Sequence, residues 1–280
     1  MLLAFDVGNT NIVAGVYEGE RLVQFWRMET SQTKSADEYG ITLIELFQNE
    51  GINIKDVENV IIATVVPSMI YTLQHLSRKY FGTTALVVGP GIKTGLIVKY
   101  DNPKQLGADR IVNSVAALAK YRAPLIIIDY GTATTFCAIT DKAEYLGGAI
   151  APGIKVESDA LFERTAQLPK VEIEAPGKTI CRNTIEGIQA GIVYGNMGMT
   201  EYIVRQMKKE IAEYTGEEKP VTVIATGGLS QMMADGVECI DYVDKGLTLT
   251  GLQILFEKNK QLAVNAKNKG AKKLQDEGVY

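Results

Sequence analysis

The chain has 280 residues, 46% of them hydrophobic and 22% charged, which is the composition of a globular protein long enough for two ordinary domains. Its net charge is −4, and because residues 258–280 carry six Lys against two acids, the remaining body carries −8. That balance excludes a general basic surface for nucleic acid. The sequence contains no run of about 18 apolar residues, which a membrane-spanning helix would need. No signal-peptide pattern precedes residue 6 either, so we expect a cytoplasmic protein.

Residue types that dominate many catalytic and metal sites are scarce. Cys137, Cys181 and Cys239 are far apart and show no CxxC spacing, so we expect reduced core thiols and neither a disulfide framework nor a zinc site. His75 is the single histidine, and its sequence context favours a helix surface. Ser-His-Asp chemistry is therefore poorly supported.

The first ninety residues predict alternating strands and helices. Ser35 and Glu38 have the spacing of a capping box at the start of an amphipathic run, and they predict a helix beginning there. A near-continuous apolar run ending at Val66 predicts a buried strand. In chain order the predicted elements are strands at 2–6, 11–17 and 21–28, a helix at 35–49, a strand at 59–66, a helix to about residue 80 and a strand at 85–88.

The second half repeats this plan with additions. Asn102-Pro103 ends any preceding helix, and an apolar-striped helix at 111–121 places Asp109 at or just before a positive helix end. The elements that follow are strands at 125–129, 135–140 and 144–150, helices within 153–164 and 184–215, a strand at 221–225 and a closing helix at 247–262. From about residue 264 the chain is polar and Lys-rich, and we expect disorder there.

Two similar hairpin sequences lie 123 residues apart. Residues 2–11 (LLAFDVGNTN) and 125–134 (LIIIDYGTAT) each place an Asp after an apolar strand and before a Gly-centred turn, and the match continues ungapped to residues 17 and 140. Residues 62–64 and 224–226 match at an offset of 162, which predicts about 39 extra residues in the second half, around 151–185. The repeat predicts two similar domains facing each other.

The two Asp-Gly loops carry groups suited to phosphate. Glycine lets the backbone approach an oxyanion, the nearby amides and hydroxyls donate to it, and Asp6 or Asp129 holds a cation or water beside it. A plain hairpin would explain Gly8-Asn9, and β-propensity would explain the threonines at 132–135. Neither explains an Asp closing both strands, so we interpret both loops as functional.

Other segments have both a structural and a functional interpretation when only the residues are considered. Gly227-Gly228 follows a buried strand, where it suits either a strand-to-helix turn or a contact with a nucleotide base or ribose. Asp109-Arg110 suits a helix-capping pair with a surface arginine as well as a site. The Gly-rich stretch 147–153 suits a tight turn or a close substrate approach. Thr165 and Thr184 would be structural without further information.

Taken together, these residues resemble the type III pantothenate kinases of the acetate and sugar kinase/Hsp70/actin superfamily. The two Asp-Gly loops and residues 225–228 (ATGG) identify the superfamily, whereas residues 101–110 (DNPKQLGADR) are diagnostic of the family. The resemblance covers all but about the last 17 residues. It implies an α/β fold of two duplicated actin-like (ribonuclease H-like) domains, with mixed sheets flanked by helices and a cleft between them. We place the domains at 1–115 and 116–263, with an insertion near 151–185 and a disordered tail at 264–280.

The resemblance also implies an activity, which is ATP-dependent phosphorylation of pantothenate to 4′-phosphopantothenate, the first step of coenzyme A biosynthesis. Implied ATP contacts are Asp6, Val7, Gly8, Asn9, Thr10, Asn11, Ile12, Val13, Thr132, Gly227 and Gly228. Asp6 would serve Mg2+, and Asp129 would bind a monovalent cation, K+ or NH4+. Asp109 would be the proton acceptor. The implied pantothenate pocket is Tyr100, Gly107, Ala108, Asp109 and Arg110, with Thr184 and Thr165 reached across a homodimer interface.

One residue departs from the family pattern, and two other functions remain to be weighed. Cys137 stands where several relatives carry Asp, which puts a peripheral contact in doubt. A sugar or carboxylate kinase on the same fold would need another acceptor pocket, and the Gly-Ala-Asp-Arg segment speaks against it. A transcription accessory protein is disfavoured by the intact Asp109 and the two loops.

Overall fold

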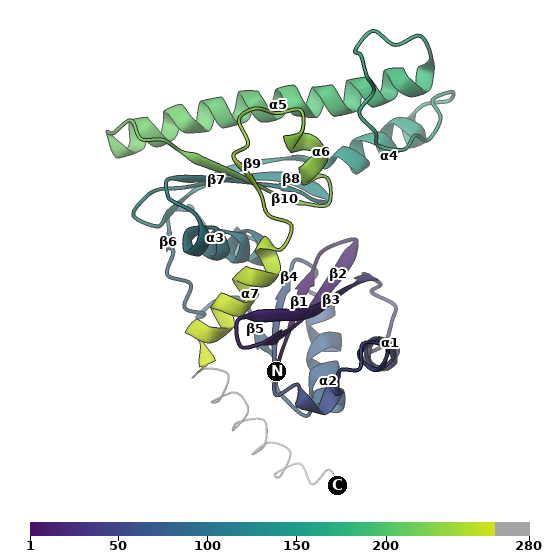
Figure 1. The fold of residues 1–280 in the computed structure, drawn as a ribbon, viewed down its shortest axis with the longest axis vertical. Helices are drawn as coiled ribbons and strands as arrows, with labels where there is room; N and C mark the ends of the chain where they lie inside the picture. The colour runs from purple at the N-terminus through teal and green to yellow at the C-terminus, as the bar shows by residue number, and fades with distance from the viewer. Residues whose placement is uncertain (261–280) are drawn as a thin grey trace. The chain divides into compact units, whose positions relative to one another are not determined.

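A computed structural model describes residues 1–260, which form two compact units (Figure 1). Of the described residues, unit 1 comprises Met1–Gly95, Lys104–Ala116 and residues 248–260, and unit 2 comprises Leu96–Pro103 and Ala117–Leu247. Each unit contains a mixed sheet with helices packed on it, as the sequence predicts. Among residues 1–260, none of the helices has the length and apolarity needed to span a bilayer.

The sheet of unit 1 has the strand order β3-β2-β1-β4-β5. Strand β1 is antiparallel to β2 and parallel to β4. Alternate residues of β1, Leu3, Phe5 and Val7, enter a core with helices α1 and α2, so Asp6 belongs to the opposite face. The elements are β1 (Leu2–Val7), β2 (Asn11–Glu18), β3 (Arg21–Glu29), α1 (Ala36–Asn49), η1 (Ile54–Asp56), β4 (Asn59–Thr64), α2 (Met69–Phe81) and β5 (Leu86–Val87).

Helix α1 begins where the sequence predicts it. The Glu38 N–H donates to Ser35 Oγ at 3.3 Å, and the Ser35 N–H donates to Glu38 Oε2 at 2.7 Å, which closes the capping box. The helix then packs closely on α2, because a Cβ at Gly40 would stand 2.3 Å from Tyr80 Cε2. His75 is exposed on α2, as expected.

The sheet of unit 2 has the strand order β11-β10-β7-β8-β9-β6. Ile126, Ile128 and Tyr130 of β7 face a core that includes residues of α4, α5 and α6, and Asp129 again belongs to the opposite face. Strands β6 and β11, which the sequence did not predict, are only two residues long. The elements are β6 (Ile97–Val98), β7 (Leu125–Tyr130), β8 (Ala133–Ile139), β9 (Glu144–Pro152), α4 (Ile154–Arg164), α5 (Thr184–Thr215), β10 (Thr222–Gly227), α6 (Ser230–Ala234) and β11 (Tyr242–Val243).

The internal repeat is present in the two sheets, but the ungapped match between the hairpins is wrong by one residue. The last pair of the first hairpin is Val7 with Ile12, and the last pair of the second is Tyr130 with Thr134. Four residues therefore lie between the last paired residues of the first hairpin, whereas three lie between those of the second. Thr134 is the equivalent of Ile12, and both are buried. A one-residue slip would have turned each side chain of β8 to the other face.

The match between residues 62–64 and 224–226 is also wrong by one residue in its offset. Leu2 pairs with Asn59, and its equivalent Leu125 pairs with Thr222, so β4 and β10 correspond at an offset of 163. The excess over 123 is 40 residues, all between β9 and β10. The added length lies in α4, in the segment 165–183 and in α5, which has 32 residues against 14 in α1, and shorter connections elsewhere offset part of it. Figure 1 shows α4, the joining segment and the start of α5 extending past the edge of the sheet, and we call residues 154–192 the arm.

Two helices complete unit 1, namely α7 (Leu247–Lys258) and, after the turn η2 (Pro103–Gln105), most of α3 (Ala108–Lys120). The sequence placed 247–262 in the second domain, but α7 makes its contacts in unit 1. Leu249 packs on Gly15, where a Cβ would stand 2.9 Å from Leu249 Cδ1, and Gln253 Nε2 donates to the Gly19 carbonyl at 3.3 Å. The tail predicted to be disordered lies outside the described residues.

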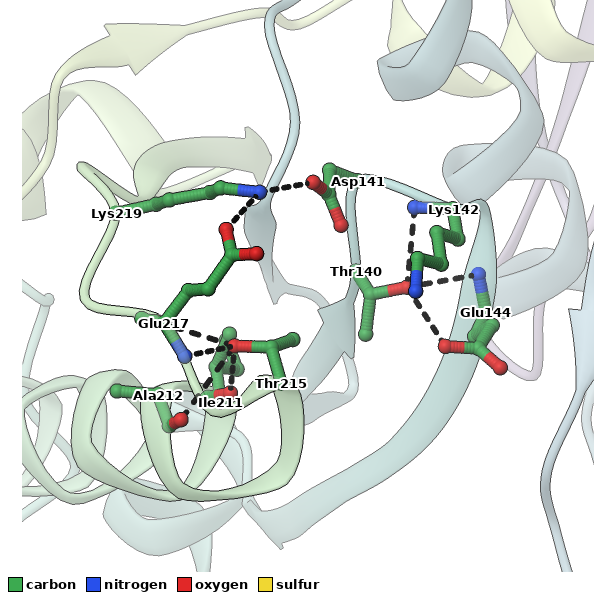
Figure 2. A network of polar contacts seen from close by, with 9 residues as sticks. All are labelled: Thr140, Asp141, Lys142, Glu144, Ile211, Ala212, Thr215, Glu217 and Lys219. Carbon is green, nitrogen blue, oxygen red and sulfur yellow. Dashed lines mark hydrogen bonds and ion pairs between the residues drawn. The ribbon is translucent and has the colours of Figure 1, made fainter.

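A polar network holds the end of the second sheet that is remote from the β7–β8 loop (Figure 2). Lys219 Nζ lies 2.6 Å from Asp141 Oδ2 and 2.5 Å from Glu217 Oε2, which ties the β8–β9 turn to the connection between α5 and β10. The hydrogen bond from Lys219 lowers the pKa of Asp141, and the same bond raises the pKa of Lys219. Within the β8–β9 turn, the N–H of Lys142 donates to Thr140 Oγ1 at 3.2 Å.

Candidate active site

The first Asp-Gly loop (residues 6–11) lies at the carboxyl end of β1. Its backbone closes on itself, since the Gly8 N–H donates to the Asn11 carbonyl at 2.9 Å. Thr30, after β3, supports it from outside, because its hydroxyl donates to the Gly8 carbonyl at 2.8 Å and its N–H to the Thr10 carbonyl at 3.0 Å. Asn9, Thr10 and Asn11 are exposed. The loop is thus held from behind and presents amide and hydroxyl groups to solvent. The supporting role of Thr30 had no signal in the sequence.

The second Asp-Gly loop (residues 129–134) is held by Gly153, directly before the arm. The Gly153 N–H donates to the Thr132 carbonyl at 3.1 Å, and a Cβ at Gly153 would stand 2.3 Å from that same oxygen. Residue 153 must therefore be glycine for the chain to pass this close. Gly131 and Thr132 remain exposed. Gly153 belongs to the Gly-rich stretch that the sequence left open, and its task here is close backbone packing.

The turn after β10 meets the second loop at Asp129. Gly227 pairs with Tyr130 and has a φ of 93°, a conformation that L side chains rarely adopt. A Cβ at Gly227 would stand 2.7 Å from Asp129 Oδ1, and a Cβ at Gly131 would stand 3.4 Å from it. Asp129, Gly131 and Gly227 therefore form one corner, with a carboxylate oxygen between two bare stretches of backbone. Gly228 is exposed beside it.

The corner rests on a buried aromatic residue. Tyr130 is 2% exposed, and its hydroxyl lies 2.9 Å from Thr200 Oγ1 of α5. Burial raises the pKa of Tyr130 to about 12, so the phenol stays protonated at neutral pH and keeps this hydrogen bond. Tyr130 thus fixes the strand beneath Asp129.

Residues 107–110 form the start of helix α3 in unit 1. The Ile111 N–H donates to the Gly107 carbonyl at 3.3 Å, which opens the helix. Asp109 folds back over this turn, since a Cβ at Gly107 would stand 2.4 Å from Asp109 Oδ1. Arg110 is only 7% exposed, so the reading of a surface arginine is wrong. Burying a guanidinium is costly unless it is paired, and Arg110, at this helix start, has an interaction partner.

Tyr100 lies in unit 2, on the segment that follows β6. The centroid of its ring is 6.2 Å from that of Tyr145. A Cβ at Gly147 would stand 3.8 Å from Cε2 of Tyr100. A salt bridge of 3.2 Å between Lys99 and Glu144 holds the same segment to β9. Gly148 is required by the sheet itself, because a Cβ there would stand 1.6 Å from the Phe136 carbonyl oxygen.

The two threonines lie on the arm of unit 2. Thr165 ends α4, donating to the Leu161 carbonyl at 2.7 Å and accepting from the Leu168 N–H at 3.3 Å. Thr184 is the exposed first residue of α5, directly after the capping residue Asn183. A pocket of about 610 Å³ lies between α4 and α5, with Thr165 in its wall. Its lining is largely apolar and comprises Glu157, Ala160, Leu161, Arg164, Thr165, Gly187, Ile188, Gly191 and Ile192.

The carboxylates of the two Asp-Gly loops are the donor groups available for a cation. Within residues 1–260, no group of three or more His, Cys, Asp or Glu side chains is placed to hold an ion. Mg2+ in kinase sites is usually held by one or two carboxylates together with substrate phosphates, and Asp6 fits that requirement. Asp129 places one carboxylate oxygen beside the backbone of Gly131 and Gly227. The three cysteines are free, and only Cys137 is fully buried.

Comparison with protein families shows which family this chain belongs to. The sequence model of the family described as type III pantothenate kinase matches residues 2–206, well over half of the chain. The chain is a member of the type III pantothenate kinases. It is thus a kinase that phosphorylates pantothenate with ATP, accompanied by Mg2+, in the first step of coenzyme A biosynthesis.

Solved structures confirm the fold class of this pantothenate kinase. A Campylobacter jejuni protein assigned to the Baf family of transcriptional activators has a TM-score of 0.56 at 17% identity, covering 92% of this chain and 99% of its own. MreB 5 of Spiroplasma citri, bound to AMPPNP, has a TM-score of 0.52 at 11% identity, covering 94% and 98%. A Sinorhizobium meliloti protein assigned as a 2-dehydro-3-deoxygalactonokinase has a TM-score of 0.51 at 10% identity, covering 91% and 95%. These likenesses show the actin-like fold alone.

Proposed function

We propose that Asp109 is the residue of this pantothenate kinase that orients the 4′-hydroxyl of pantothenate and accepts its proton. The observation that carries this role is the Asp109 carboxylate folded over Gly107 at the start of α3, next to the buried Arg110. Phosphoryl transfer needs mainly positioning and charge neutralisation, and the acceptor proton leaves late. Arg110 grips the pantothenate carboxylate through a charge-assisted contact, and Tyr100, Gly107 and Ala108 complete the pocket.

The nucleotide is assigned to the two Asp-Gly loops. Residues 6–13 contact the ATP phosphates, and the carboxylate of Asp6 serves the Mg2+ that accompanies them. In unit 2, Thr132 and the glycines 227 and 228 contact the nucleotide. The support for this assignment is that both loops are held from behind and leave their amide and hydroxyl groups exposed.

Asp129 is proposed to bind K+ or NH4+. A bound cation adds positive charge where negative charge accumulates on the transferring phosphoryl group. The corner of Asp129, Gly131 and Gly227 supports this, because two glycines keep side-chain carbon away from the carboxylate. Asp129 is then a ligand that holds charge near the nucleotide, while proton transfer stays with Asp109.

A homodimer is proposed to complete the acceptor pocket with Thr184 and Thr165 of the partner subunit. The arm exposes Val156, Leu161, Phe162 and Ile185 by 37% to 52%, and Leu161 also lines the pocket of about 610 Å³. Exposed apolar surface of this kind is typical of a protein interface. The arm also contains most of the residues of unit 2 that have no counterpart in the repeated part of unit 1.

One assay tests the catalytic and cation assignments together. ADP release is measured with pantothenate and a panel of other acceptors, in K+ buffer and in Na+ or Tris buffer alone. Asp109→Asn should lose turnover by about 10²–10⁴-fold, the contribution of a positioned base, while still binding ATP and melting like the wild type. A variant that keeps more than about half of the turnover contradicts the base assignment. Equal rates without K+ would remove the cation role from Asp129.

A further inference from the structure

The end of helix α7 grips a glycine-rich loop in unit 1. Asn259, only 1% exposed, accepts from the Lys93 N–H through Oδ1 at 2.8 Å and donates through Nδ2 to the Lys93 carbonyl at 2.9 Å. The same Nδ2 donates to the Leu255 carbonyl at 2.8 Å, which satisfies the helix end. Lys258 Nζ adds a contact of 3.3 Å to the Thr94 carbonyl. One buried amide therefore pairs with both backbone groups of a single loop residue.

This loop needs such a clamp because its own sequence does not fix it. Residues 89–95 read GPGIKTG, they contain no helix or strand, and Gly91 and Gly95 have φ values of 90° and 83°. Glycine leaves the backbone many accessible conformations, so an unclamped loop of this kind would be loose. The loop leads directly into residues 96–110, which carry Tyr100, Asp109 and Arg110.

The same helix also holds the far end of that segment. Thr248, in the first turn of α7, donates its hydroxyl to Asn113 Oδ1 of α3 at 2.8 Å. Gly251 lies so close to α3 that a Cβ there would stand 2.2 Å from the Val112 carbonyl oxygen. Asn113 is four residues beyond Asp109, one helical turn along the same face of α3. Helix α7 thus contacts the chain at 93–94 and again at 112–113, on either side of the acceptor segment.

We infer that α7 is a brace for the acceptor segment and that Asn259 and Thr248 are positioning residues for pantothenate. Neither residue needs to touch the substrate; each fixes one end of the stretch that does. The inference rests on the proposed roles of Tyr100 and residues 107–110 in binding pantothenate. Small displacements of a positioned group are costly in phosphoryl transfer, because the reaction depends mainly on geometry.

Three variants in the full-length enzyme test the brace. Asn259→Ala removes the clamp on Lys93, and Thr248→Val removes the hydroxyl with little change of shape. Gln253→Ala is the matched control, because Gln253 is a buried amide on the same helix that bonds to Gly19, away from the acceptor segment. Kinetic constants are measured for pantothenate and for ATP separately, together with the melting temperature of each variant.

The brace predicts that the use of pantothenate is impaired while the KM for ATP is unaffected. Asn259→Ala should lower kcat/KM for pantothenate by about ten- to a hundredfold, the cost of a misplacement on the order of 1 Å, with KM for ATP unchanged. Thr248→Val should show the same selectivity with a smaller loss. Gln253→Ala should melt lower, as Asn259→Ala does, but keep the wild-type constant for pantothenate.

Two results would overturn the inference. One is an Asn259→Ala variant whose KM for ATP rises as much as its KM for pantothenate, and the other is a Gln253→Ala variant with the same pantothenate defect. Either one reduces α7 to a stability element. A failure of the underlying site assignment is recognised separately, because Asp109→Asn would then retain turnover whatever the α7 variants do.

Discussion

Gly227 is the residue on which the Asp129 corner depends. Its φ of 93° suits glycine, and the space where a Cβ would go is already taken by Tyr130 O at 2.5 Å and Asp129 Oδ1 at 2.7 Å. Any side chain at 227 must therefore strain the end of β10 and displace the Asp129 carboxylate together. The position couples backbone geometry to the proposed cation ligand.

Gly227→Ala should accordingly damage both stability and nucleotide use. The strained backbone should cost roughly 1–3 kcal/mol in the free energy of unfolding, measured by urea denaturation, and the displaced carboxylate should raise the K+ concentration needed for half-maximal rate. Gly228→Ala is the stability control, because residue 228 has no positive φ and nothing within 4 Å of its Cβ position. Equal unfolding free energies for the two variants would contradict this account.

At the level of single residues, the sequence identified candidates but not their surroundings. Asp6 and Asp129 could be predicted because the repeat places an Asp after the same apolar strand twice. The burial of Arg110 could not, because nothing near it in sequence distinguishes an interior arginine from a surface one at a helix start. The register of β8 was missed because Thr134 and Thr135 are chemically alike, and only pairing shows which one is equivalent to Ile12.

Among the elements, the β8–β9 turn should show a pH dependence that its charges determine. The pKa of Asp141 is lowered from 3.8, so the stability it contributes is present above that value and is lost as the pH falls through the lowered pKa. The pKa of Lys219 is raised from 10.5, so its contribution is present below that value and is lost as the pH rises through the raised pKa. Between these limits the ion pair is intact.

Lys219→Met should therefore lower the melting temperature by a constant small amount at intermediate pH, and the difference from wild type should shrink in strong acid. The effect is small because both side chains are partly exposed and water screens the pair. Lys142→Met is the control on the same turn, since it acts on Asp141 through a weaker Coulombic attraction and keeps its backbone hydrogen bond to Thr140. A difference independent of pH would show that packing, not charge, links the turn to residue 219.

Elements with strong local signals were predicted, and those made by long-range pairing were not. The capping box at Ser35 and the apolar run of β4 are local, and both are confirmed. Strands β6 and β11 have two residues each and exist only because β9 and β10 pair with them. The position of α7 in unit 1 depends on its contacts with Gly15 and Lys93, far away in sequence, which no periodicity within α7 records.

For the whole molecule, the proposed dimer predicts complementation between two inactive subunits. Asp109→Asn lacks the base, and Thr184→Trp is too bulky to admit pantothenate into the partner's pocket. Each homodimer should be inactive, whereas a mixture should regain one good site per heterodimer, because a symmetric interface forms two identical shared sites. The measurement is ADP release before and after subunit exchange, with exchange verified by labelled subunits.

Two outcomes oppose the shared site. Persistent inactivity after verified exchange would place Thr184 outside the acceptor pocket. A fully active monomer, shown by light scattering at the assay concentration, would do the same. Each variant mixed with wild type is the control, since each such heterodimer should also contain one good site. With the Thr184 variant, that site joins the wild-type arm to the variant's own Asp109.

The discontinuity of unit 1 sets an order on how the protein is completed during synthesis. A ribosome delivers residues 1–95 and 104–116 well before Thr248, and at about 5–20 residues per second the delay is on the order of ten seconds. Residues 117–247 meanwhile emerge almost without interruption and contain nearly the whole of unit 2. The face of β2 at Gly15 stays uncovered until Leu249 arrives. Nascent chains stalled at Leu247 should resist protease first in unit 2, so the part translated first is finished last.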